Sequence, residues 1–245
     1  HTNLFTEFPL FLNRISLKSI RDYLQSNVKV DPKTIFENLL GLERKYFENE
    51  FDYDYYFEAC WKTHTYFYTL FDHTPYNDYF GMKNVGKSKR LKLSRMLCYN
   101  GHLTGDASVS SIFRTIEGSG TTLLLDETEN LQGRKEDRKD LENLLRNGFS
   151  KEGQVTRSKE GKNKDFKPEV YSVFSPKAFG HIYGMDNVLE DRNLRTTLTR
   201  TTIKEIADSE PDEKNNPLIR ETRESLYKLF LDYGDEVFNL ISEAK

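Results

Sequence analysis

Cysteine is scarce in this chain of 245 residues, and its two copies, Cys60 and Cys98, lie far apart. Two isolated cysteines do not supply the paired ligands of a common zinc site, and they argue against a disulfide framework. We therefore expect both thiols to be reduced and buried.

Long apolar runs are also missing, because no stretch approaches the roughly 18 residues that a membrane span requires. Nothing at the start resembles a secretory signal, so we expect a cytoplasmic protein without a membrane partner. The first residue is His1 rather than Met, which suggests a piece of a longer protein.

A charge excess of either sign is absent. Lys and Arg number 36 against 39 Asp and Glu, which gives a net charge of −3. Bulk electrostatics therefore exclude a uniformly basic nucleic-acid binder, and any such site must be a local patch. Aromatic residues, in contrast, make up 13% of the chain, enough to form a packed core.

The hydrophobic pattern alternates between helices and strands. Asp31 and Pro32 mark a helix start within a helical N-terminal part, because proline suits the first helical turn. Strands are predicted at 76–82, 120–127 and 171–175, and helices at 86–100, 108–118, 136–149 and 224–244. This order predicts an α/β fold with a central parallel sheet flanked by helices. The expected division is a helical segment at 1–70, a core at 71–203 and a helical segment at 204–245.

The stretch Gly81–Ser88, GMKNVGKS, fits the pattern G-x-x-x-x-G-K-[ST] between a predicted strand and a predicted helix. In such a loop the backbone N–H groups, here including those of Asn84, Val85 and Gly86, point inward at phosphate oxygens. Lys87 would contact the β- and γ-phosphates, and the Ser88 hydroxyl would bind Mg²⁺. The alternative is a coincidental glycine-lysine loop.

Two acids, Asp126 and Glu127, end the apolar strand TLLLDE that follows the loop by 38 residues. The carboxyl end of such a strand lies where open α/β sheets bind ligands. Asp126 would hold Mg²⁺ through its water shell, and Glu127 would act as general base toward water. A surface acidic pair would explain the two acids alone, but not their order after the loop. Together the motifs predict a P-loop nucleoside triphosphatase that uses Mg²⁺, with ATP as the default nucleotide.

Four further segments extend the pattern: Ala107–Leu131, Asp140–Arg157, Val173–Ile182 and Val188–Arg200. In this order they resemble the P-loop ATPase domains of plasmid, phage and viral replication proteins, which often accompany primases. These domains are similar to AAA+ and superfamily 3 helicases. The resemblance covers about residues 56–200 and implies a hexameric ring that acts on single-stranded or forked DNA.

The resemblance also implies roles for single residues. Ser175, at the end of the strand expected at 171–175, would sense the γ-phosphate. Arg192 would be an arginine finger that reaches the nucleotide of a neighbouring subunit, with Arg195 as the alternative. The plain reading of Arg192 is an ion pair with Glu190 or Asp191.

The segment Lys151–Lys167 contains six basic residues in two extended runs and predicts a hairpin with a basic tip. The candidates for contact with DNA phosphates are Arg157, Lys159, Lys162 and Lys164. A solvated loop is the alternative. Two functions follow: a DNA translocase or helicase with a possible primase partner, or a nucleotide-dependent switch that controls another protein.

Overall fold

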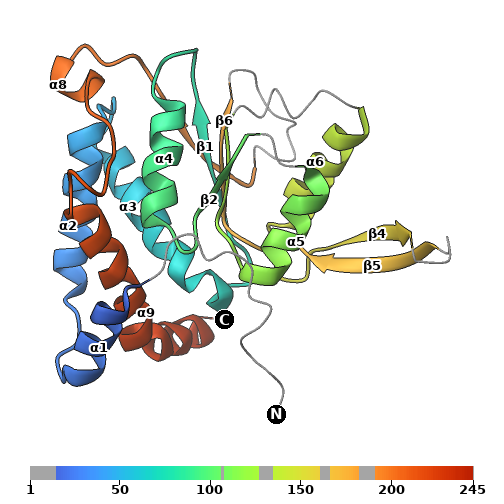
Figure 1. The fold of residues 1–245 in the computed structure, drawn as a ribbon, viewed down its shortest axis with the longest axis horizontal. Coiled ribbons are helices and arrows are strands. Elements are labelled where there is room, and N and C mark those ends of the chain that lie inside the picture. The colour runs from blue at the N-terminus through green and yellow to red at the C-terminus, as the bar shows by residue number, and fades with distance from the viewer. Residues whose placement is uncertain (1–14, 106–107, 127–134, 161–165, 182–190, 245) are drawn as a thin grey trace.

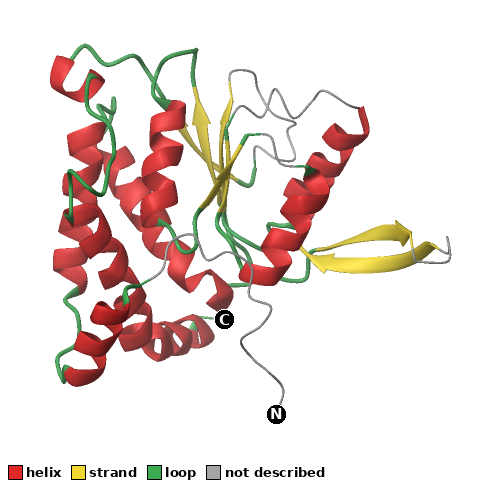
Figure 2. Ribbon diagram, in the orientation of Figure 1, coloured by secondary structure: helices red, strands yellow, loops and turns green. Residues whose placement is uncertain are grey.

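The computed structural model describes residues 15–105, 108–126, 135–160, 166–181 and 191–244. Figure 1 shows three layers: one group of helices, a central sheet, and a second group of helices on the opposite face. A two-stranded hairpin projects from the second group, as Figure 2 also shows. None of the helices in these ranges is long and apolar enough to cross a bilayer.

The central sheet has five parallel strands in the order β2-β3-β6-β1-β7. The strands are β1 (Tyr76–Phe80), β2 (His102–Thr104), β3 (Leu123–Leu125), β6 (Lys177–His181) and β7 (Asn193–Thr197). β3 and β6 are buried along their whole length, as the interior strands of a covered parallel sheet must be. The predicted α/β class with a parallel sheet is confirmed at this level.

One face of the sheet carries α4 (Lys87–Leu97), backed by helices from both ends of the chain (Figure 1). These helices are α1 (Leu17–Gln25), α2 (Pro32–Tyr46), α3 (Asp52–Phe67) with the 3₁₀ turn Tyr68–Leu70, α8 (Lys204–Ala207) and α9 (Leu218–Glu243). Asp31 caps α2 by accepting the N–H groups of Lys33 and Thr34, so the predicted start is confirmed. One apolar core joins α2, α3, α4 and α9.

The opposite face carries α5 (Val109–Ser119) and α6 (Lys135–Asn147). Phe113, Leu144 and Phe179 are fully buried between these helices and the sheet. Ser108 caps α5 through the N–H of Ser111, and Gly120 ends it with a φ of 57°. Apolar side chains at helical spacing thus place α5 and α6 where the sequence predicted helices.

The hairpin consists of β4 (Gln154–Glu160) and β5 (Phe166–Ser172), paired antiparallel. The predicted pairing of two extended runs is therefore confirmed, whereas residues 161–165, which include the expected basic tip, lie outside the described residues. The hairpin extends away from the sheet on the side of α5 and α6 (Figure 1), near the amino-terminal ends of the sheet strands.

Two expectations are wrong. The strand expected at 171–175 does not exist in the sheet: β5 ends at Ser172 in the hairpin, and the sheet strand is β6. Pro176 cannot donate a ladder hydrogen bond, so the chain changes direction before it enters the sheet. Cys60 is exposed on α3, whereas Cys98 is buried as expected.

Candidate functional site

The loop between β1 and α4 has the backbone of a tight turn. Asn84 and Gly86 have left-handed φ values of 64° and 97°, and Gly86 directly precedes the first turn of α4. Gly81 is required by packing, because a Cβ there would lie 2.7 Å from the carbonyl oxygen of Leu198. These positions explain why the loop has glycine at its first and sixth residues.

Lys87 bends back over this loop. Its Nζ donates to the carbonyl oxygens of Gly81 and Met82 at 2.5 and 2.8 Å. The aliphatic stem runs along β6, because a Cβ on Gly180 would lie 3.1 Å from the Cβ of Lys87. The ammonium group is thus held against the loop carbonyls, at the N-terminal end of an 11-residue helix whose dipole favours anions.

Ser88 and Asp126 meet across the sheet although 38 residues separate them. The Ser88 hydroxyl donates to Oδ1 of Asp126 at 3.1 Å. Asp126 follows β3, and its N–H donates to the carbonyl of Thr104 on β2. A hydroxyl and a carboxylate are hard oxygen donors of the kind that bind Mg²⁺. Glu127, the expected general base, lies outside the described residues.

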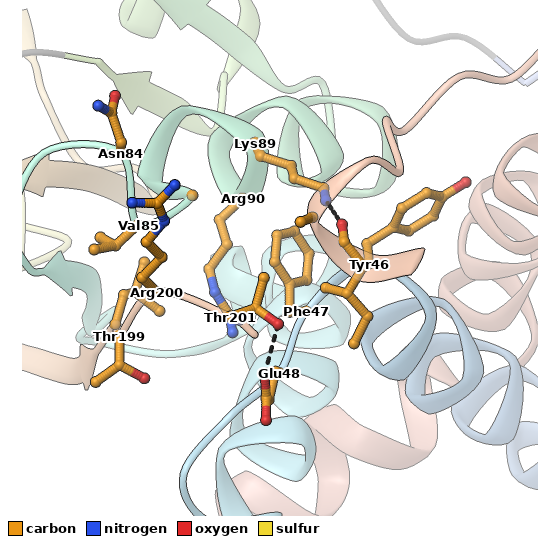
Figure 3. A pocket seen from close by; sticks show the side chains of 14 residues that line it. Tyr46, Phe47, Glu48, Asn84, Val85, Lys89, Arg90, Thr199, Arg200 and Thr201 are labelled. Atoms are coloured by element: carbon orange, nitrogen blue, oxygen red, sulfur yellow. Dashed lines mark hydrogen bonds between the residues drawn. The ribbon is translucent and has the colours of Figure 1, made fainter. Parts of the chain in front are cut away.

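A cavity of about 230 Å³ opens beside the end of the loop (Figure 3). Asn84, Val85 and Gly86 form one wall. Lys89 and Arg90 of α4 line the cavity as well. The other walls are formed by the end of α2 and the two residues after it (Tyr46, Phe47 and Glu48), by the segment after β7 (Leu198 to Thr201) and by α8 (Ile206 and Ala207). Sequence patterns do not reveal this cavity, because its walls come from three segments without a common motif.

Direct bonds fix the far wall of the cavity to α4. Lys89 Nζ donates to the carbonyl of Ile206 at 2.6 Å and to the hydroxyl of Ser209 at 2.9 Å. Thr201 donates its hydroxyl to Glu48 at 2.5 Å, which joins the segment after β7 to the segment after α2 across the opening of the cavity (Figure 3).

Four buried charges, of which Arg90 also lines the cavity, hold α4 against α2 and α3. Lys62 Nζ contacts Glu43 at 2.9 Å and Glu58 at 2.5 Å. Arg90, on the first turns of α4, lies 3.4 Å from Glu43 and 3.6 Å from Glu58. All four side chains are at most 2% exposed. We call Glu43, Glu58, Lys62 and Arg90 the buried ion cluster.

The ion cluster shifts the titration of its members. Desolvation acts to lower the pKa of Lys62, but the carboxylates of Glu43 and Glu58 outweigh it and hold the pKa well above its ordinary value. Desolvation raises the pKa of Glu43 despite the attraction of Lys62. Tyr79 donates its hydroxyl to Glu58 at 3.1 Å, which stabilises the charged carboxylate.

Ser175 and Arg192 lie away from the loop. Ser175 precedes β6, at the amino-terminal edge of the sheet, and its hydroxyl accepts from the buried Lys177 at 3.2 Å. The structure therefore does not place Ser175 at a carboxyl strand end. Arg192 precedes β7 at the same edge, donates to the carbonyl of Arg146, and lies with its guanidinium 5.4 Å from the centroid of the Phe149 ring.

Arg195, the alternative to Arg192, belongs to a group that sequence patterns do not indicate. Its Nε donates to Oδ2 of Asp78 at 2.9 Å, and His181 Nε2 hydrogen-bonds the other oxygen of the same carboxylate. Asp78 is fully buried on β1, between β6 and β7. An acid in a strand and a histidine at a strand end carry no local sequence signal.

The basic candidates of the hairpin are only partly placed. Arg157 and Lys159 lie on β4, opposite Glu169 and Lys167 of β5. Lys162 and Lys164 lie outside the described residues. The hairpin and the loop Gly81–Ser88 lie toward opposite ends of the sheet strands (Figure 1).

Comparisons with known proteins give distant likenesses only. No family model matches the chain, and no curated protein matches it. A structure of the JCV helicase with a bound inhibitor is similar at a TM-score of 0.42 and 13% identity, over 92% of this chain and 65% of that one. A second inhibitor-bound JCV helicase gives a TM-score of 0.33 and 14% identity, over 88% and 65%. The chain thus spans just under two thirds of their length, and these scores are too low to establish a shared fold.

Proposed function

We propose that this chain is a P-loop ATPase of the helicase type, whose loop Gly81–Ser88 binds the triphosphate and whose neighbouring subunit supplies Arg192. The observation that carries the proposal is the contact between Ser88 and Asp126 at 3.1 Å. The sequence predicted these two residues as partners at one magnesium ion. β1, which leads into the loop, and β3, which leads to Asp126, run parallel with β6 between them.

Lys87 is suited to bind the β- and γ-phosphates. Its ammonium group now donates to two loop carbonyls, and a phosphate in the loop would offer charged oxygens in their place. The N–H groups at the start of α4 point to the same space, where the helix dipole adds to the attraction. Two sources of positive potential, the Lys87 ammonium group and the N-terminal end of α4, therefore converge on one loop.

Ser88 and Asp126 fit Mg²⁺, since both present oxygen atoms and lie in hydrogen-bond contact. Bound there, the metal would neutralise charge on the transferred phosphoryl group. Ser88 would bind it directly, and Asp126 would orient its water shell. Glu127, the next residue in the chain, remains the proposed general base.

The cavity beside the loop is suited to hold the base of the nucleotide. Phe47 presents an aromatic ring, and the guanidinium of Arg90 lies 4.3 Å from the centroid of that ring, which fixes the ring in place. Asn84, Val85 and Gly86 belong to both the loop and the cavity, so a phosphate chain in the loop leads directly to it. The lining combines apolar side chains, such as Val85 and Ile206, with polar ones that could fix the orientation of a bound base.

Arg192 supports an oligomeric enzyme. It precedes β7, whose first residue pairs with the first residue of β1, whereas the loop follows the last residue of β1. Five strand residues span about 16 Å, so Arg192 is not positioned to reach the loop of its own chain. We infer that Arg192 instead reaches the nucleotide bound by another copy of the chain, where it would stabilise the charge of the transition state.

The test is ATP hydrolysis over a range of protein concentrations, with and without single-stranded DNA, for the wild type and Arg192→Ala. We expect the specific rate to rise with concentration and with DNA. The specific rate of Arg192→Ala should be at least about 100-fold lower than that of the wild type, while the variant still binds ATP. The matched control is Arg146→Ala, which removes a nearby side chain but keeps the carbonyl that Arg192 contacts. A rate that is independent of concentration and unchanged in Arg192→Ala would contradict the shared site.

The hairpin decides between a DNA motor and a protein switch. We expect the variant with Glu at Lys159, Lys162 and Lys164 to lose at least about tenfold of its affinity for single-stranded DNA at low salt. Fluorescence anisotropy with a labelled oligonucleotide measures this loss, and the salt dependence should become less steep. Glu at Lys204, Lys214 and Lys228 reverses as many charges outside the hairpin and serves as the control. Equal losses in both variants, or none in either, would favour the switch.

A further inference from the structure

We propose that Asp78, His181 and Arg195 form a relay that transmits occupancy of the phosphate loop to β7 and so positions Arg192. This inference rests on the ATPase function proposed above. The three side chains come from the neighbouring strands β1, β6 and β7, and they connect the edge of the sheet that carries the loop to the strand that Arg192 precedes.

The relay begins at the loop itself. The N–H of Gly81, the first loop residue, donates to the carbonyl of His181 at 3.3 Å. Gly180 supports the stem of Lys87, because a Cβ on that glycine would lie 3.1 and 3.3 Å from the Cβ and Cδ of the lysine. If the Lys87 ammonium group moved from the loop carbonyls to a bound phosphate, the lysine stem and Gly81 would shift. The backbone at residues 180 and 181, which contacts both, would then shift with them.

Asp78 is the central member. Its carboxylate is completely buried, and each oxygen accepts from a different strand, one from His181 and the other from Arg195. A buried carboxylate that loses a hydrogen-bond donor destabilises the folded state. If one donor moves, the structure therefore favours a movement of the carboxylate and of the second donor that keeps both bonds. The carboxylate thus couples β6 to β7 through β1.

The relay ends at an edge strand. Among the described strands β7 pairs only with β1, so fewer hydrogen bonds restrain it than restrain the interior strands. The carbonyl of Arg192 accepts from the N–H of Tyr76 at 3.0 Å, and β7 starts at the next residue. A shift of β7 along β1 would therefore change where the Arg192 guanidinium points.

Arg195 offers the cleanest variant, because its side chain is 35% exposed and Arg195→Gln should fold. Three measurements apply to the full chain: ATP affinity, steady-state hydrolysis, and hydrogen exchange of the β7 amides with and without Mg-ATP. In the wild type we expect ATP to slow exchange in β7 by about threefold or more. In Arg195→Gln this response should vanish, and kcat should fall about tenfold with ATP affinity within about twofold.

A double-mutant cycle separates the relay from a merely structural role. In the Arg192→Ala background, Arg195→Gln should reduce the remaining rate by less than about twofold, because both act through one guanidinium. Asp78→Asn should behave as Arg195→Gln does, and Arg220→Gln on the exposed face of α9 serves as the control. Additive losses, or a β7 response that survives in Arg195→Gln, would overturn the relay and leave the ATPase standing. Absence of ATP binding in the wild type would overturn the ATPase and the relay with it.

Discussion

Lys87→Ala is expected to lose at least about 100-fold of the rate of ATP hydrolysis, together with most of the affinity for the triphosphate. The ammonium group is the charged donor closest to the loop carbonyls, at 2.5 and 2.8 Å, and its removal leaves only backbone donors and the helix dipole. Fluorescent-nucleotide titration and phosphate release measure the two effects. The fold should survive, since the lysine is neither fully buried nor part of the apolar core.

Lys83→Ala is the matched control for this variant. It removes the same kind of side chain from the same loop, but Lys83 is exposed, whereas Lys87 is partly buried and donates to the loop carbonyls. We expect its rate and affinity to stay within about twofold of the wild type. Equal losses in the two variants would mean that the loop responds to net charge alone, and the assignment of Lys87 would be wrong.

Lys62→Met is expected to destabilise the protein by about 3–5 kcal/mol, which corresponds to a fall in Tm of about 10 °C in a chain of this size. The variant keeps the volume of the side chain but removes the cation that contacts both Glu43 and Glu58. Two buried carboxylates then share the single guanidinium of Arg90. Thermal and urea unfolding measure the loss.

The loss should also depend on pH. Without Lys62 the pKa of one buried carboxyl rises above its value in the unfolded chain, since desolvation already raises the pKa of Glu43. A raised folded pKa favours the folded state at low pH, and this contribution disappears as pH rises through that pKa. The deficit of Lys62→Met relative to the wild type should therefore be smallest near about pH 5 and largest near about pH 8.

A second substitution provides the control. Glu43→Gln together with Lys62→Met removes one charge of each sign and leaves Glu58 opposite Arg90. We expect this pair to recover more than half of the lost stability and to remove most of the added pH dependence. A double variant as unstable as Lys62→Met at every pH would show that the loss comes from packing rather than from charge.

Local patterns in the sequence were sufficient for the elements around the loop. The glycine pattern, the apolar strand before Asp126 and the spacing of leucines in α4 each depend on neighbours in the chain, so β1, α4 and β3 were predicted close to their observed bounds. The contact between Ser88 and Asp126 could be expected as well, because carboxyl ends of parallel strands meet at one edge.

The rest depends on interactions between distant segments. β6 was missed because Lys177 and His181 give it a polar sequence, although both side chains are buried: His181 pairs with Asp78 on β1, and Lys177 donates to the carbonyls of Gly148 and Val173. Ser175 was misplaced for the same reason. The cavity walls at Phe47 and Ile206, and the bond between Asp78 and Arg195, likewise join residues that only the folded chain brings together.

The buried ion cluster has a consequence for how this protein can be divided or recombined. A fragment that starts at residue 71 would retain the loop but lose Glu43, Glu58 and Lys62, and Arg90 would remain as an uncompensated cation beneath it. It would also lose the aromatic wall at Phe47. The N-terminal helices therefore cannot be replaced by those of another protein on their own. A chimera that keeps the ion pairs must transfer α2, α3 and α4 together.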